Sequence, residues 1–138
     1  MLTEFVKHVA AQAGLTHNQA SAAIGVILNA SDRQGAALAE MIFERIPGAR
    51  TLAAETGAQT GAPSGVIARL IERTPGGRMS VLHQTMRALH DQGLGSRQIG
   101  AILPAISDFC EVRLGLGGVA SLGDMFGAAT PDRARSAA

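Results

Sequence analysis

Apolar residues recur every three or four positions along most of the chain, a spacing that places them on one face of an α-helix. The first segment shows this spacing at Leu2, Phe5, Val6, Val9 and Ala13. No segment alternates apolar and polar residues at a period of two, so a β-sheet is not expected. The pattern therefore predicts an all-α fold, a compact bundle of six or seven short helices.

Glycine and proline bound most of these helices. Helices that end at glycine or at a Pro-Gly pair are expected over residues 2–13, 36–46, 79–92 and 96–114. Pro104 should kink the last of them. A shorter helix over residues 49–56 would have Gly57 as its C-cap.

One further helix differs from the others because it is apolar almost all round. It begins at Thr16-x-x-Gln19, a capping box in which each side chain can pair with a free backbone donor, and it runs to about Ser31. Its thin polar or small-residue stripe includes Gly25 and Asn29. A helix with so little polar surface is expected at the centre of the bundle.

Aromatic residues are scarce, at 3% of the chain, with no Trp or Tyr. The core must then be built from Ala, Ile, Leu, Val and Met, and Ala also favours helix formation. The missing aromatic side chains remove the stacking surfaces that single-stranded nucleic acids usually need. With a net charge of only +1, a nucleic-acid partner is not expected.

The chain is expected to form a single helical domain over residues 1–128, followed by a flexible tail over residues 129–138. Residues 57–64 are rich in Gly and Ala and predict a linker, which would permit two similar lobes, 1–56 and 65–128. No signal peptide is expected, because Glu4 and Lys7 lie among the apolar residues of the N-terminus and leave no apolar h-region. No transmembrane segment is expected, because no apolar run approaches about 18 residues. A cytoplasmic location is therefore predicted.

Two segments of the chain resemble each other. Gly14-Leu15 followed by Gln19 matches Gly93-Leu94 followed by Gln98. Each copy predicts a short helix, a Gly-Leu turn and a longer apolar helix. An internal duplication would produce this similarity, and so would chance similarity between two capped, Ala-rich helices.

Several short motifs give the chain a family resemblance. They are Glu4-Phe5-Val6, Gly14-Leu15-Thr16-x-x-Gln19-Ala20, Ile46-Pro47-Gly48-Ala49 and Ile102-Leu103-Pro104-Ala105-Ile106. Together they resemble the bacterial helical domain of unknown function called VcgC/VcgE-like, over most of residues 2–128. The resemblance implies a small helical bacterial protein, and it implies no activity, cofactor or functional residue.

The most concentrated polar cluster is His83, Arg87, His90 and Asp91 on one predicted helix. Two zinc-binding histidines on a helix usually stand four residues apart, and here that position is Arg87, which cannot bind a metal. An acid–base pair would also need a nucleophile that is not evident. The favoured interpretation is a solvated face, so no catalytic residue, metal or cofactor is assigned.

Methionines suggest a second candidate, an apolar groove formed by Met41, Met79, Met86 and Met125. Such residues can accept a partner helix or an acyl chain, although they more often fill a core. Cys110 is the only cysteine and falls on an apolar stripe, so we expect a buried, unreactive thiol rather than a nucleophile.

These patterns favour a non-enzymatic helical interaction or scaffold module, one that binds a protein partner or associates with itself. A carrier of a small hydrophobic ligand between helices is the alternative. An enzyme with a site at His83, His90 and Asp91 is a further alternative.

Overall fold

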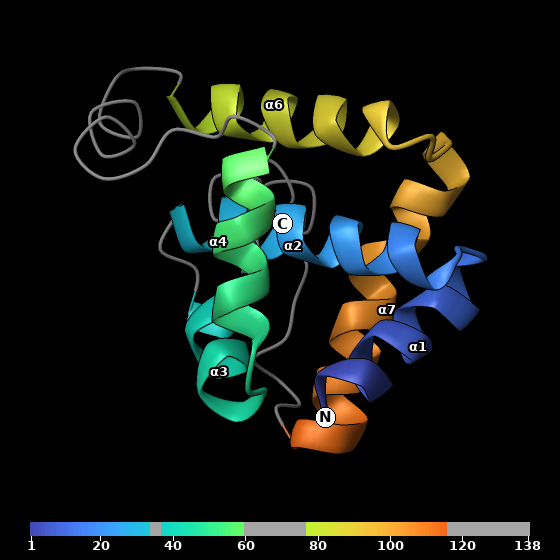
Figure 1. Cartoon of the computed structure of the whole chain (residues 1–138), viewed down its shortest axis with the longest axis vertical. Coiled ribbons are helices and arrows are strands. Elements are labelled where there is room, and N and C mark those ends of the chain that lie inside the picture. The colour runs from blue at the N-terminus through green and yellow to red at the C-terminus, as the bar shows by residue number, and fades with distance from the viewer. Residues whose placement is uncertain (34–36, 60–76, 116–138) are drawn as a thin grey trace, which may run out of the picture.

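The computed structural model describes residues 1–33, 37–59 and 77–115. In these ranges the chain is helical and contains no strand, so the all-α prediction is confirmed (Figure 1). The helices are α1 (Leu2–Ala13), α2 (His17–Arg33), α3 (Ala37–Arg45), α4 (Ala49–Gln59), α6 (Gly77–Asp91) and α7 (Ser96–Leu114). The predicted tail over residues 129–138 lies outside the described residues, as does the predicted linker beyond Gln59.

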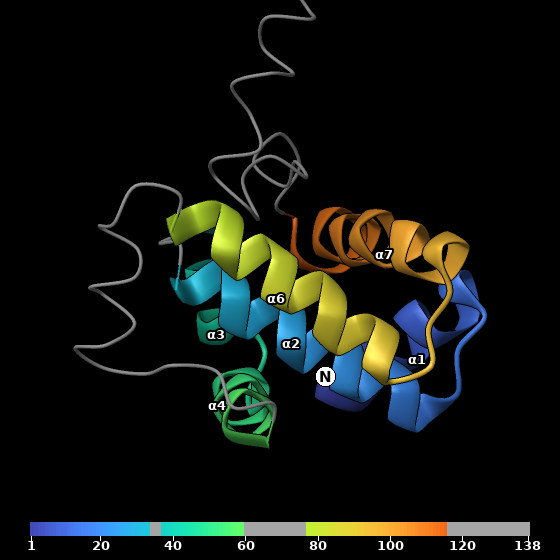
Figure 2. The ribbon, with the colours of Figure 1, turned by 90° about the horizontal axis from the view of Figure 1, so that it is seen from above.

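Helix α2 is the centre of the bundle, as its apolar sequence predicts. It packs against α1, α3, α4 and α6, and it crosses the middle of the molecule in Figure 1. Figure 2 shows α6 lying over α2 and running along it, with α7 and α1 grouped on one side of this pair. Six consecutive residues of α2, from Ala23 to Leu28, are buried. A helix covered on so many sides cannot carry the polar face of a surface helix.

The core joins the first and the last helix of the described residues. Helix α1 packs against α7, where the rings of Phe5 and Phe109 lie 4.9 Å apart between centroids. Both rings are almost completely buried. One continuous cluster of buried apolar residues includes side chains from α1, α2, α3, α4, α6 and α7. The two predicted lobes therefore share a core in this structure.

Helix α4 continues past the predicted stop, so the assignment of Gly57 as a C-cap is wrong. The helix ends at Gln59, and Gly57 is buried within it. Gly57 faces Asn29 of α2 so closely that a Cβ atom would lie 2.5 Å from Asn29 Nδ2. Gly25 makes a similar close approach to Thr56. These two glycines therefore allow α2 and α4 to pack closely, and neither forms a turn. The first three residues of the predicted linker belong to α4.

The two Gly-Leu turns have the conformation that their sequences predict. Gly14 and Gly93 have φ values of 69° and 87°, in the left-handed region that favours glycine. Thr16 N donates to Gln19 Oε1 over 3.0 Å, and Gln19 N donates to Thr16 Oγ1 over 3.1 Å, which confirms the capping box. In the second copy Gly95 N donates to Gln98 Oε1 over 2.9 Å.

Helix α7 runs without a break from Ser96 to Leu114, through the exposed Pro104. Among the helices of the described ranges, none is both long enough and apolar enough to cross a bilayer.

Candidate functional site

The predicted polar cluster is divided by the structure. All four residues are exposed, but only Arg87 and Asp91 line a groove between α2 and α6, and His83 and His90 are not among its lining residues. His90 Nδ1 lies 3.2 Å from the carbonyl oxygen of Leu94, so this histidine contacts the turn that follows α6. The four residues therefore do not face one common site.

The groove, called the α2–α6 groove below, is half open to solvent and has a volume of about 510 Å³. That volume lies in the range of about 300 to 1,000 Å³ that is usual for ligand sites. Helix α2 forms one wall, α6 the other, and the end of α4 closes one side. The groove is lined by Val26, Asn29, Ala30, Arg33, Gln59, Gln84, Thr85, Arg87, Ala88, Asp91 and Gln92.

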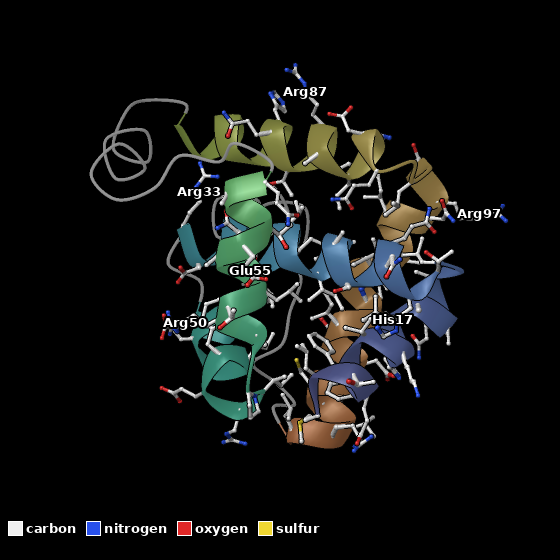
Figure 3. All side chains as sticks on the ribbon, viewed as in Figure 1. His17, Arg33, Arg50, Glu55, Arg87 and Arg97 are labelled. Atoms are coloured by element: carbon white, nitrogen blue, oxygen red, sulfur yellow. The ribbon has the colours of Figure 1, made fainter. Side chains whose placement is uncertain are left out.

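The lining is mainly polar. It contains four amide side chains, two arginines and one aspartate, and its apolar part is limited to Val26, Ala30 and Ala88. Figure 3 shows Arg33 beside the end of α4, and Arg87 on the side of α6 that faces away from the rest of the molecule. The amides supply donors and acceptors of hydrogen bonds. The groove therefore suits a polar ligand.

Gln92 adds a buried acceptor to this groove. Its Oε1 atom is buried and has no hydrogen-bond partner among the described residues. A buried carbonyl oxygen without a partner costs about 1 to 3 kcal/mol. A rotation of this half-buried side chain would let a bound donor satisfy the oxygen.

Most residues of this groove could not be predicted from the sequence, because they come from three different helices. Arg87 and Asp91 were singled out, but Asn29, Arg33 and Gln84 were not assigned to a site. Asn29 gave one signal, since it belongs to the thin polar stripe of the most apolar helix of the chain. The meeting of α2 with α6 depends on tertiary packing, which the helical pattern does not specify.

The methionines of the predicted apolar groove are only partly described. Met41 on α3 and Met86 on α6 are half-buried and pack against the core. In Figure 1 these two helices lie at opposite ends of the molecule, with α2 between them. The side chains of Met79 and Met125 lie outside the described residues, so the four-methionine groove stays a prediction.

Cys110 has the surroundings expected of an unreactive thiol. Its side chain is fully buried on the inner face of α7, and burial raises the pKa of the thiol to about 11. The thiolate is the nucleophilic form, so a raised pKa disfavours covalent chemistry at this position. Within residues 1–33, 37–59 and 77–115, no three His, Cys, Asp or Glu side chains form a group that could hold a metal ion.

A second group of polar contacts joins α1 to α7. The sequence pattern did not predict it. His8 Nε2 lies 3.0 Å from Asp108 Oδ2, and Gln12 Nε2 donates to the same oxygen over 3.2 Å. The His8 ring also lies 5.6 Å from the Phe109 ring. Nearby, Arg113 forms an ion pair with Glu4 and holds the pKa of that carboxyl below its ordinary value. These contacts connect α1 and α7, the first and last helices of the described residues.

Comparison with protein-family models, curated proteins and solved structures found no match to this chain. The resemblance to the VcgC/VcgE-like domain therefore stays a prediction, and the case for a function rests on the geometry of the described residues.

Proposed function

We propose that the chain is a non-enzymatic helical interaction module and that the α2–α6 groove is its binding surface. One observation carries the proposal: polar side chains from three helices converge on a half-open groove instead of facing separate parts of the solvent. One wall of the groove belongs to α2, the most buried helix of the bundle. A partner bound there would contact a rigid part of the molecule.

The chemistry of the groove favours binding over catalysis. Its titratable side chains are Arg33, Arg87 and Asp91, and an arginine remains protonated and cannot act as a general base. Cys110 belongs to the inner face of α7 and has a raised pKa. A catalytic site would usually combine a nucleophile with a base in hydrogen-bond contact. The proposal therefore assigns recognition, not a reaction, to this groove.

The two alternative functions gain no support from the α2–α6 groove. A hydrophobic-ligand carrier would need an apolar cavity, and this lining is mainly polar. An enzyme with a site at His83, His90 and Asp91 would need those side chains to converge, and the two histidines lie outside the groove. We therefore advance only the interaction module.

Photocrosslinking from inside the groove tests the proposal. A photoreactive amino acid replaces Gln84, an exposed residue of the lining, and in a matched variant it replaces Lys7, an exposed residue of α1. After irradiation in the native host, we expect the Gln84 variant to give discrete adducts with one protein, or with a second copy of this chain. Identical adduct patterns from the two positions, or no protein adduct from Gln84, would contradict the proposal.

A further inference from the structure

The two similar helix–turn–helix segments, α1–α2 and α6–α7, match in burial as well as in sequence. An offset of 79 positions aligns Gly14 with Gly93 and Gln19 with Gln98. The same offset aligns buried residues of α2 with buried residues of α7: Ala20, Ala23, Val26, Ile27, Ala30 and Ser31 correspond to Ile99, Ile102, Ala105, Ile106, Phe109 and Cys110. Helix α2 is therefore the counterpart of α7, and α1 is the counterpart of α6.

The two segments also contact each other in equivalent ways. Helix α1 packs against α7, and its counterpart α6 packs against α2. Gln98 Nε2 donates to the carbonyl oxygen of Gly14 over 3.1 Å. The equivalent Nε2 atom of Gln19 lies near Gly93, 4.0 Å from the place that a Cβ atom would take there. The α2–α6 groove is thus the counterpart of the contact between α1 and α7.

Two aromatic rings fill the α1–α7 contact, and the α2–α6 groove lacks both of them. Phe5 and Phe109 lie 4.9 Å apart between ring centroids, and both are almost completely buried. The same offset of 79 positions places Gln84 and Ala30 at the equivalent positions, and both residues line the groove. The open volume of the groove therefore lies where the other contact holds aromatic side chains.

The lining of the groove fits a tyrosine better than a phenylalanine. Its apolar part, formed by Val26, Ala30 and Ala88, provides a surface for one face of an aromatic ring. Gln92 Oε1 is buried without a hydrogen-bond partner among the described residues, and it can accept a bond from a phenolic hydroxyl. Tyrosine combines an apolar ring with such a donor, and it is common among the residues that dominate the energy of protein–protein binding.

We infer that the α2–α6 groove binds a tyrosine side chain of the partner protein. The inference rests on the proposed function, because it names the group that the same surface recognises. The ring lies against Val26, Ala30 and Ala88, and the hydroxyl group donates to Gln92 Oε1. This chain contains no tyrosine, so the partner is a different protein and not a second copy.

Selection from a library of random octapeptides displayed on phage tests the inference with the full-length chain as bait. We expect the enriched peptides to share a tyrosine. In fluorescence anisotropy, the leading synthetic peptide should bind about tenfold more weakly when alanine replaces its tyrosine. Replacement by phenylalanine should weaken binding about threefold, because the hydrogen bond is lost and the ring remains.

Three outcomes of the peptide experiment would overturn the inference. They are the enrichment of peptides without a tyrosine, the absence of any enriched peptide, and equal affinities of the tyrosine, phenylalanine and alanine versions of the leading peptide. These measurements use the wild type and so do not depend on whether a variant folds.

Ala30→Phe supplies a second test, because it places in the groove the counterpart of Phe109. The new ring takes the space of the bound tyrosine, so the leading peptide should bind about tenfold more weakly. Ala11→Phe is the matched control, at an exposed residue of α1 outside the groove, and it should leave the affinity unchanged. Equal losses of affinity in the two variants would overturn the inference. Ala88→Phe blocks the same space from α6 if Ala30→Phe does not fold.

These failures can be distinguished from failure of the proposed function. If the Gln84 photoadducts still identify a protein partner, the groove remains an interaction surface and only the recognised group is wrong. Photoadducts with a second copy of this chain would have the same meaning, because the chain has no tyrosine to offer.

Discussion

Burial controls the chemistry of single side chains in this molecule, as the pKa of Cys110 shows. Burial raises that pKa to about 11, so the thiol should stay protonated at about pH 8. We expect labelling by a thiol-reactive chromogenic disulfide to be slow in the folded protein and to become fast after unfolding in urea. Rapid labelling of the folded protein would show that the side chain is more accessible or more acidic than its position on α7 indicates.

Asp32 gives a prediction about pH at the same scale. Partial desolvation, followed by repulsion from Glu40, raises the pKa of Asp32 above its ordinary value of 3.8. The fold therefore disfavours the ionised carboxylate, and this cost is present above the raised pKa. Asp32→Asn should raise the melting temperature at neutral pH. The advantage should vanish as the pH falls toward 3.8, because the wild-type side chain is then also neutral.

Glu4 provides the control for Asp32, because its pKa shifts in the opposite direction. The hydrogen bond from Arg113 and the charge of that residue lower the pKa of Glu4 below 4.5. The ionised form stabilises the fold above 4.5, and this contribution is lost as the pH falls through the lowered pKa. Glu4→Gln should therefore lower the melting temperature slightly at neutral pH. Melting temperatures of Asp32→Asn and Glu4→Gln that move in the same direction would contradict this account.

At the scale of helices, two glycines differ in their surroundings: one lies against a neighbouring helix and the other has open space beside it. A Cβ atom at Gly25 would lie 2.2 Å from Thr56 Oγ1, whereas a Cβ atom at Gly100 would meet nothing within 4 Å. Both glycines lie inside helices, α2 and α7. Gly25→Ala should destabilise the protein by about 1 to 3 kcal/mol because α2 and α4 must separate.

Gly100→Ala is the matched control for Gly25→Ala. It should stabilise the protein by about 0.5 to 1 kcal/mol, since alanine has the higher helix propensity and nothing obstructs it. Urea denaturation measures both changes in the free energy of unfolding. Equal and small effects of the two substitutions would mean that α2 and α4 do not pack as closely as the structure shows.

These helices also show how far the sequence predicts the fold. The ends of α1 and α7 were predicted correctly because Gly14 and Gly115 end them in left-handed conformations that glycine favours. The end of α4 was not predicted, because a glycine inside a helix and a glycine after a helix look alike in sequence. The contact between Gly57 and Asn29 decides between them, and that contact forms only in the folded molecule.

At the scale of the whole molecule, the two similar helix–turn–helix segments pack against each other. Helix α1 packs against α7, and α2 packs against α6. The first helix of each segment therefore contacts the second helix of the other segment. Gln98 Nε2 donates to the carbonyl oxygen of Gly14 over 3.1 Å, which joins the two turns directly. The sequence revealed the two turns but not their contact, because residues far apart in the chain meet only through tertiary packing.

This contact makes Gln98 more important for stability than Gln19. Gln98 bonds both Gly95 N and the carbonyl oxygen of Gly14, whereas the bond recorded for the Gln19 side chain is the one from Thr16 N. Gln98→Ala should cost about 1 to 2 kcal/mol and Gln19→Ala about 0.5 to 1 kcal/mol. Chemical denaturation of the two variants checks the order, and a larger loss in Gln19→Ala would contradict the proposed link between the turns.

Native mass spectrometry of the gently purified protein tests the central claim, that the α2–α6 groove is an interaction surface. The wild type, Arg87→Glu and Arg97→Glu, a matched charge reversal at an exposed residue of α7 outside the groove, are each purified from the native host. We predict a complex with a polypeptide, or a multimer of this chain, in the wild type and in Arg97→Glu, and its loss in Arg87→Glu. A monomer that carries a lipid or another small molecule, or a complex that persists in Arg87→Glu, would contradict the account.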